Sequence, residues 1–393
     1  MAVVINGTTG IDRVQDGSIV TADIVDGAVT VNKVTGELGR RNMSGNGAMQ
    51  VSQRATSLSD INNGNGRVLD RHTFYAGGSA GTHTLSQSQV VPSGEAFSHS
   101  LKIDCTSAGD YSTVGDSAFL RLAPVEIQDC AKLSYGTSSA KKITVSFWTR
   151  ASYTGTFTAL IVSHDTAQRN IIKTFTISSA DTWQKVVLTY DGDTTITTGS
   201  TYFNGSAKQN MGISLDIWMG GGSNYTGGSQ SDGVWRARSA HNTSILEGNG
   251  TLFGTNTSHD FYITGVQVEQ NDTATEFEHR TFGDELALCQ RYFYKADNRI
   301  VNSMKVVSGS STGGAVIAMT FPVNMRTTPT LAFTDGAGNV NKISYHNGNI
   351  SSGVNHNLAL NYAEPRTTHA QVYTASYNGY DCYITNLTAE SEH

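Results

Sequence analysis

The densest group of side chains that could act as acids, bases or ligands lies in residues 268–293, VEQNDTATEFEHRTFGDELALCQRYF. The stretch holds four Glu, two Asp, two Arg, one His and one Cys, in a chain of which only 15% is charged. Paired carboxylates are what glycoside hydrolysis needs. The first candidates for an acid/base pair are therefore Glu276, Glu278, Glu285, Asp284 and His279. The stretch is therefore either an active site or a structural joint.

The spacing of these carboxylates favours a joint. Catalytic carboxylates face each other across a groove. Glu276 and Glu278 are two residues apart, so in an extended segment they point to the same side, where His279 and Arg280 can pair with them. Neither the zinc-binding motif HExxH nor the phosphate-binding motif GxxxxGK[ST] occurs in the sequence. The sequence therefore predicts a protein that is not an enzyme and has no catalytic residues.

The composition of the 393 residues favours neutral, hydrated partners. Charged residues are well below the roughly 25% of ordinary globular proteins, and Ser, Thr, Asn and 41 Gly take their place. A surface of hydroxyls and amides suits glycans. Nucleic acid is not an expected partner, because the net charge is −6 and no Lys/Arg run is present to neutralise phosphates.

Residues 1–37 carry a short internal repeat. In groups of five from position 12 the chain reads DRVQD GSIVT ADIVD GAVTV NKVTG, and the third position is always aliphatic: Val14, Ile19, Ile24, Val29 and Val34. This period fits neither a helix nor a half-buried strand. Several chains side by side could pool such residues into a core, so we interpret the segment as an oligomerising attachment segment. The alternative is an unstructured tail of low hydrophobicity.

The rest of the chain is predicted to be almost entirely β. Residues 38–72 lose periodicity and gain Asn/Gly pairs, so we expect a linker or shaft. Residues 73–282 contain many alternating segments, such as ITVSFW, separated by turn residues. This pattern predicts an antiparallel sandwich, and its length exceeds the roughly 100 residues of an immunoglobulin-like domain, which favours a jelly roll.

One helix is expected between two β domains. Leu286, Cys289 and Phe293 recur at near-helical spacing, and Thr281 or Asp284 could cap the helix. We assign a connecting helix to residues 283–300. Residues 301–393 return to strands and Gly/Asn turns, which predicts a second, smaller β-sandwich. The predicted fold class is therefore all-β.

The cysteines and the first residues indicate the compartment. Cys105, Cys130, Cys289 and Cys382 lack the CxxC spacing of zinc sites. A Cys105–Cys130 disulfide stays open, but we favour four reduced, mostly buried thiols in a protein assembled in a cytoplasm. Residues 1–10 resemble no secretory signal, and no apolar run reaches the roughly 18 residues of a membrane span. We expect no membrane insertion.

A metal site is the weaker of two interpretations of YDGDTT. Asp191 and Asp193 could supply oxygen ligands to a structural calcium ion. The same residues fit an Asp-Gly hairpin turn, which we favour. No other cofactor is expected.

Glycan binding requires aromatic rings that stack on sugar C–H surfaces, surrounded by amides and hydroxyls. The glycine-rich loop 221–244 places Tyr225, Trp235 and Arg236 among such residues, and Trp218 lies three residues before its start. The alternative is that these rings fold back onto the sandwich.

Two further aromatic groups are assigned from position. Trp148 and Trp183 lie in alternating segments, so we expect them in the core. The run YTASYNGYDCY supplies Tyr377 and Tyr380 as a second binding candidate, because Tyr among Ser, Asn and Gly resembles the chemistry of antibody paratopes.

Four segments resemble tail fibre and receptor-binding proteins of tailed bacteriophages. TATEFEHRTFGDELALCQRYF (273–293) resembles their junction motif, and VSFWTR with FTISSADTWQKVVLTY (within 145–190) resembles the core strands of a jelly roll similar to carbohydrate-binding modules. VIAMTFPVNMRTTPTLAF (316–333) resembles a segment of C-terminal fibre domains. VINGTTGIDRVQDGSIVTADIVDGAVT (4–30) is similar to N-terminal regions of phage fibres that attach to the virion.

The resemblance implies a homotrimeric virion protein. Its N-terminal segment would bind phage tail or baseplate proteins, and its distal part would bind a bacterial surface polysaccharide, with many weak sites adding up by multivalency. The expected location is the tail fibre of the virion. The alternatives are a capsule-degrading depolymerase and a purely structural head or tail spacer.

Overall fold

The computed structural model describes residues 40–392, apart from 165–167, 196–209, 228–231, 238–243, 247–251, 297–299, 303–314, 319–320, 335–337, 339, 341, 347–349, 356–362, 365–366 and 373–380. Outside the described residues lie the pentad positions and the two tip candidates: Val14, Ile19, Ile24, Val29, Val34, Tyr377 and Tyr380. Their predictions stay predictions. By its contacts the chain divides into Met1–Arg41 and Asn42–His393, and every element below belongs to the second unit.

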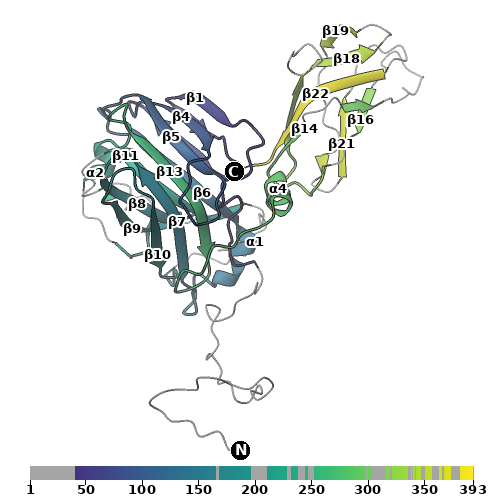
Figure 1. Ribbon diagram of the computed structural model, residues 1–393. Coiled ribbons are helices and arrows are strands. Elements are labelled where there is room, and N and C mark those ends of the chain that lie inside the picture. Colours follow the sequence, from purple (N-terminus) through teal and green to yellow (C-terminus); the bar gives the residue numbers. More distant parts are fainter. Residues whose placement is uncertain are drawn as a thin grey trace, which may run out of the picture. The chain divides into compact units, whose positions relative to one another are not determined.

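Two antiparallel sheets form a sandwich (Figure 1). Sheet A has the order β1 (Ser57–Ile61), β4 (Thr82–Ser88), β5 (Ser100–Ser107), β13 (Asp260–Glu269), β7 (Ile143–Ala151) and β10 (Gln184–Tyr190). Sheet B has the order β12 (Arg236–Ala237), β9 (Arg169–Ile177), β8 (Gly155–Ser163), β11 (Met211–Gly221), β6 (Ser117–Glu126), β3 (Thr73–Gly77) and β2 (Gly64–Gly66). The predicted antiparallel sandwich is confirmed at this level.

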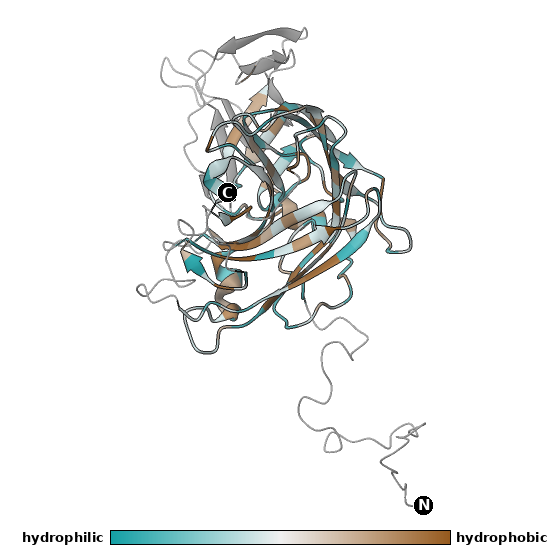
Figure 2. Ribbon diagram, turned by 90° about the vertical axis from the view of Figure 1, so that its left-hand side faces the viewer, coloured by the Kyte–Doolittle hydropathy of each residue, from teal (hydrophilic) through white to brown (hydrophobic). Residues whose placement is uncertain are grey.

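Alternation along the strands builds the core between the sheets. In β7 the residues Ile143, Val145 and Phe147 are buried in it, and Phe261 of the same sheet meets Phe157 of sheet B with ring centroids 5.4 Å apart. Figure 2 shows hydrophilic and hydrophobic residues mixed along the same strands. Each fully buried large apolar side chain contributes about 1.5–3 kcal/mol, so this face dominates the stability of the sandwich.

Sheet B is also apolar on part of its outer face. A second cluster of buried residues lies there: Leu160, Val162, Ile172, Trp218, Ile245 and Leu246. The run ALIV in β8 has apolar residues at both parities, which is typical of a strand covered on two sides. The short helix α2 (Ser223–Thr226) and the segment around Ile245 follow β11 and supply the cover, because Tyr225 and Leu246 pack against this cluster.

The segment predicted as a linker lies partly within the sandwich. β1 pairs with β4 at the edge of sheet A, and β2 pairs with β3 at the edge of sheet B. Met49 and Leu69 are fully buried beside them. The sequence of this segment gave no strand signal because edge pairing uses backbone groups and needs no alternating hydrophobic pattern.

The connecting helix is shorter than predicted. α4 spans Phe282–Gln290, and Thr281 is its N-cap, accepting a hydrogen bond from the backbone N–H of Asp284. Besides α2, the described residues also form the short helical segments α1 (Ile127–Cys130) and η3 (Ala131–Leu133). No helix among the described residues is long and apolar enough to cross a membrane.

The C-terminal part adds smaller sheets. The long strand β22 (Asp381–Glu390) pairs with β14 (Phe293–Ala296), β15 (Ile300–Asn302), β17 (Thr330–Thr334) and β18 (Lys342–His346), and β18 pairs with β19 (Ile350–Asn355). A separate sheet contains β16 (Ala315–Ala318), β21 (Thr367–Val372) and β20 (Ala363–Glu364). Strands are thus present where the smaller β domain was predicted.

Three cysteines of the described part can be assigned. Cys105, Cys130 and Cys289 are free and buried. The open question of a Cys105–Cys130 disulfide is therefore settled in favour of thiols. Burial in an apolar environment raises the pKa of all three, which keeps them protonated and unreactive.

Candidate functional site

The acidic stretch makes the contacts of a joint. Glu278 accepts a hydrogen bond of 2.7 Å from the backbone N–H of Asn42, and Glu285 accepts one of 2.5 Å from that of Asn46. Arg280 lies 3.2 Å from Glu278 and 3.7 Å from Glu285, and it donates to the carbonyl oxygens of Asn42 and Ser44. These carboxylates fix the segment that begins at Asn42.

The joint continues at the end of β22. Arg54 and Arg67 contact Glu390 at 3.3 and 2.9 Å, and Arg71 lies 3.5 Å from Glu392. The Arg71 guanidinium also lies over the Tyr292 ring, 3.3 Å from its centroid. Cation–π and ionic contacts of this kind connect the segment that holds Arg54, Arg67 and Arg71 to residues more than 200 positions later.

The outer face of sheet B carries a row of stacked rings. Tyr75, Phe119 and Trp218 occupy neighbouring positions of β3, β6 and β11. The centroids of Tyr75 and Phe119 are 5.2 Å apart, those of Phe119 and Trp218 are 5.0 Å apart, and Tyr225 follows at 4.8 Å from Trp218. We call these four residues the aromatic row. Trp218 is only 5% exposed, whereas the other three rings are partly exposed.

A polar row runs beside the aromatic row, two residues away along each of the same strands and therefore on the same face. Thr73 pairs with Arg121, and Arg121 pairs with Asp216. Arg121 donates to Asp216 through Nε at 3.0 Å and Nη2 at 2.7 Å, and Ser214 donates to Asp216 at 2.8 Å. Burial alone would raise the pKa of Asp216, but the Arg121 guanidinium and these hydrogen bonds outweigh it and lower the pKa. Asp216 is therefore ionised, and its carboxylate is held in place by Arg121 and Ser214.

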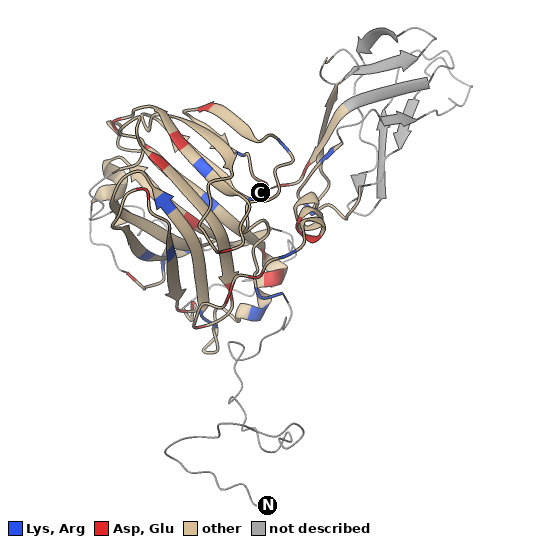
Figure 3. Cartoon of the chain, in the orientation of Figure 1, with Lys and Arg blue, Asp and Glu red and all other residues tan. Residues whose placement is uncertain are grey.

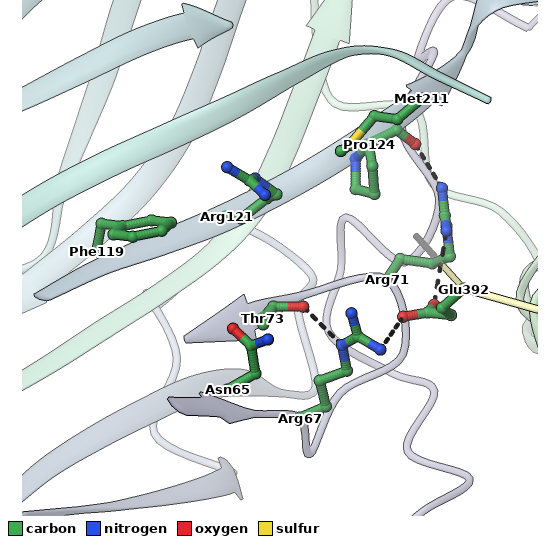
Figure 4. Close-up of a pocket in the computed structure, with 9 residues that line it drawn as sticks. All are labelled: Asn65, Arg67, Arg71, Thr73, Phe119, Arg121, Pro124, Met211 and Glu392. Atoms are coloured by element: carbon green, nitrogen blue, oxygen red, sulfur yellow. Dashed lines mark hydrogen bonds and ion pairs between the residues drawn. The ribbon is translucent and has the colours of Figure 1, made fainter. Parts of the chain in front are cut away.

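A pocket of about 70 Å³ opens where the two rows meet the segment before β3 (Figure 4). Its lining combines one aromatic ring, three guanidinium groups, one carboxylate and several small polar or apolar groups: Asn65, Arg67, Arg71, Thr73, Phe119, Arg121, Pro124, Met211 and Glu392. Figure 4 shows Phe119, Arg121 and Pro124 along one strand, facing Arg67 and Thr73. This volume holds several water molecules, and therefore a hydroxyl-bearing or carboxylate-bearing group of a ligand.

The structure brings together two of the loop candidates and separates the others. Trp218 and Tyr225 share the aromatic row. Trp235 lies elsewhere: its indole Nε1 donates to the carbonyl of Asp191 at 2.6 Å, and its ring meets Tyr135 edge-on. Arg236 is exposed in β12, the edge strand of sheet B.

The expectation that Trp148 and Trp183 belong to the core is wrong. Both are only partly buried. In β7 the core parity is taken by Phe147, so Trp148 points to the outer face of sheet A. Trp183 precedes β10 and contacts Tyr262 edge-on at 6.2 Å.

Sequence reasoning missed Phe119 and Tyr75. Both residues alternate with buried apolar neighbours, Phe119 between Ala118 and Leu120, and Tyr75 between Phe74 and Ala76. An aromatic residue at the outward parity of a strand is a signal for a ring on the outer face. That signal was available in the sequence.

The two candidate calcium ligands are paired with cations. Asp191 lies 2.9 Å from Lys142, and the buried Asp193 lies 2.6 Å from Arg169. Among the described residues no group of three or more His, Cys, Asp or Glu side chains could hold a metal ion. The calcium hypothesis stays a prediction, and these ion pairs give Asp193 a structural role without calcium.

Residues 77–81 have the GxSxG pattern of a nucleophilic serine, but in this structure they form a turn between two strands. Its central Ser79 donates to Asp116 and lies 3.2 Å from the hydroxyl of Ser112, between β3 and β4. The pattern follows a strand, as in a nucleophile elbow, but leads into a second strand in place of a helix.

The comparisons with known proteins concern the fold alone. No family model matches the chain, and no curated protein matches it. A family 11 carbohydrate-binding module from Clostridium thermocellum, solved with a mixed-linked tetrasaccharide, has 9% identity over 56% of this chain and 99% of its own, with a TM-score of 0.26. A family 4 carbohydrate-binding module has 13% identity over 57% of this chain and 98% of its own, with a TM-score of 0.28.

One similar structure comes from a bacteriophage. The enzymatically active domain of tailspike protein 4 from bacteriophage CBA120 has 12% identity and a TM-score of 0.28. The match covers 58% of this chain but only 21% of that domain. The chain thus has a distant structural similarity to carbohydrate-binding modules and to a phage tailspike domain.

Proposed function

We propose that the chain binds a glycan at the pocket beside Phe119, and that it does so as a non-enzymatic receptor-binding protein of a phage tail fibre. The observation that carries the glycan-binding proposal is the meeting of the aromatic row and the polar row. Tyr75 and Phe119 offer partly exposed ring faces, and Thr73, Asn65 and Arg121 offer hydrogen-bonding groups beside them.

The chemistry of this surface fits sugars. A pyranose presents C–H groups on its faces and hydroxyls around its edge, so it stacks on a ring and hydrogen-bonds to polar groups beside it. The rings of the row are held by stacking on one another and on the covered Trp218. A fixed ring loses little conformational entropy when a ligand binds, which favours affinity.

The phage assignment rests on the sequence. The junction motif at 273–293, the segment at 316–333 and the pentads support a tail fibre that is homotrimeric and attached to the virion through residues 1–37. A jelly-roll topology for the sandwich belongs to the same proposal. Charges of both signs are sparse on the sandwich strands (Figure 3), which is consistent with a partner recognised by hydrogen bonds and stacking.

The test is binding of the full chain to a panel of purified bacterial surface polysaccharides, measured by biolayer interferometry. We expect Phe119→Ala to weaken binding about 30-fold, the effect of losing a contact worth about 2 kcal/mol. Trp148→Ala is the matched control, because it removes a partly exposed ring from the opposite sheet. Equal losses in both variants, or no binding by the full chain, would overturn the proposal. New reducing ends in the polysaccharide would favour the depolymerase.

A further inference from the structure

We propose that this pocket selects an acidic sugar, such as a hexuronate, whose carboxylate binds Arg67. The inference rests on the glycan-binding function proposed above and names the chemical class of its ligand. Its basis is the distribution and exposure of charge in the pocket, which the general argument for sugar stacking does not use.

Guanidinium groups are concentrated in the pocket. Three of its nine lining residues are Arg67, Arg71 and Arg121, in a chain with 27 Lys and Arg among 393 residues. Only one lining residue, Glu392, is acidic. Arginine is the side chain best suited to bind carboxylates, because its planar fork matches their geometry.

The arginines differ in how firmly their present partners are held. Arg71 and Glu392 are 3% and 4% exposed, and burial, which alone would raise the pKa of Glu392, is outweighed by Arg71, Arg54 and Arg67, which lower it. Such a buried pair is expensive to break. Arg67 has two partners: its Nη1 lies 2.9 Å from Glu390, which is 44% exposed, and 3.6 Å from the buried Glu392 (Figure 4). The shorter of its two contacts is therefore the exposed one.

An exposed pair of this kind exchanges readily. Surface ion pairs contribute little, since water solvates both partners almost as well. A ligand carboxylate that enters the pocket can therefore replace Glu390 at Nη1 of Arg67, while Glu390 keeps its contact with Arg54 at 3.3 Å. The new pair would be more enclosed than the old one, because Arg67 lines the pocket whereas Glu390 is not among its lining residues.

Arg67 is positioned for this exchange. Its Nε donates to the hydroxyl of Thr73 at 2.9 Å, and Thr73 is the strand neighbour of Arg121. Arg121 uses Nε and Nη2 for Asp216, so Nη1 lies outside that bidentate pair. A sugar ring stacked on Phe119 would direct its carboxylate toward the guanidinium groups that share the pocket.

The experiment compares two probes that differ only at this group, methyl β-D-glucuronide and methyl β-D-glucoside, by saturation-transfer NMR titration of the full chain. We expect the glucuronide to bind about tenfold more tightly, the effect of one charge-assisted hydrogen bond. Arg67→Gln should remove this preference. Glu390→Gln should raise the affinity for glucuronide about threefold, because an exposed competitor is removed, and should leave the affinity for glucoside unchanged.

Controls separate this inference from the proposed function. Arg150→Gln removes an arginine from a comparable exposed pair, Arg150–Asp181, on sheet A, and should change neither affinity. In the unmodified chain, added NaCl should weaken glucuronide binding and leave glucoside binding unchanged. Equal affinities for the two probes, or no measurable glucuronide binding, would overturn the acidic-sugar inference. Loss of polysaccharide binding in Phe119→Ala would still uphold the glycan site.

Discussion

The ring of Phe119 is stacked on the indole of Trp218, with centroids 5.0 Å apart and an angle of 15° between the planes. One ring is partly exposed and the other is buried. The pair therefore joins a surface that a ligand can reach to the apolar cluster under the loop that follows β11. A binding ring with such support keeps one orientation.

Trp218→Ala should destabilise the protein by about 3–5 kcal/mol, because a large buried side chain is lost and a cavity remains. Urea denaturation followed by circular dichroism measures this change. The partly exposed Trp148 is the matched control, and Trp148→Ala should cost much less. Similar small losses for both variants would mean that Trp218 is available to a ligand and contributes little to packing.

Arg280→Ala should destabilise the protein by about 3–5 kcal/mol, because it removes the guanidinium group that contacts two nearly buried carboxylates, Glu278 and Glu285. Arg150→Ala is the control, since its partner Asp181 is largely exposed and the pair contributes at most about 1 kcal/mol. Chemical denaturation compares the two variants. If Arg280→Ala cost no more than the control, the joint would depend on backbone hydrogen bonds alone.

His72 should make the stability fall below neutral pH. Burial lowers the pKa of His72 from 6.5 to about 4, against a hydrogen bond to the carbonyl of Asn46 that raises it. The native state therefore binds fewer protons than the unfolded state between these values, and stability decreases as the pH falls from about 6.5 toward 4.

The loss attributable to His72 is about 3 kcal/mol between pH 7 and pH 4. Denaturation curves at both pH values, for the natural chain and for His72→Gln, measure it. The amide can still donate to Asn46 but does not titrate, so the variant should lose less stability on acidification. Identical pH dependence in the two proteins would contradict the assignment.

Shortening the chain should show where the folded unit begins. A chain without residues 1–41 keeps every strand described here and should retain its unfolding temperature. A chain without residues 1–70 loses β1 and β2 and the buried Met49 and Leu69, and should unfold or aggregate. Light scattering of the same proteins tests the trimer, which we expect for the full chain. A stable chain without residues 1–70 would restore the linker interpretation.

Calcium should leave the protein unchanged. Arg169 already neutralises Asp193, and its Nε lies 2.6 Å from the Asp193 carboxylate. Thermal unfolding in CaCl2 and in EDTA should therefore give the same midpoint. An unfolding midpoint that is higher in CaCl2 than in EDTA would establish the calcium site predicted from YDGDTT, provided that Asp193→Asn abolishes the difference.

The sequence predicted the features that depend on local pattern. The alternation in β7, the cap at Thr281 and the burial of three of the four cysteines, Cys105, Cys130 and Cys289, were predicted from the sequence, and the structure confirms them. The joint also follows from spacing, because neighbouring carboxylates cannot face each other across a groove.

The site depends on register between distant strands, which pattern alone does not specify. Phe119 and Trp218 are neighbours only because β6 and β11 pair at that position. Alternation was a signal that could have placed the overlooked Tyr75 and Phe119 on an outward face, but it did not show that both belong to one sheet. Nor did it show that Arg67, from a segment predicted as a linker, would meet them in a pocket.

The joint also sets an order of events during synthesis of the protein. The contact between Asn42 and Glu278 cannot form until 236 more residues have been added to the chain. The contact between Arg54 and Glu390 requires 336 more residues. At elongation rates of about 5–20 residues per second the first delay lasts roughly 10–50 seconds. Contacts of such sequence separation form late in folding. The growing chain therefore exposes unpaired strand edges and apolar surface until the residues around Glu390 have been made, and its yield in the cell should depend on chaperones more than its final stability suggests.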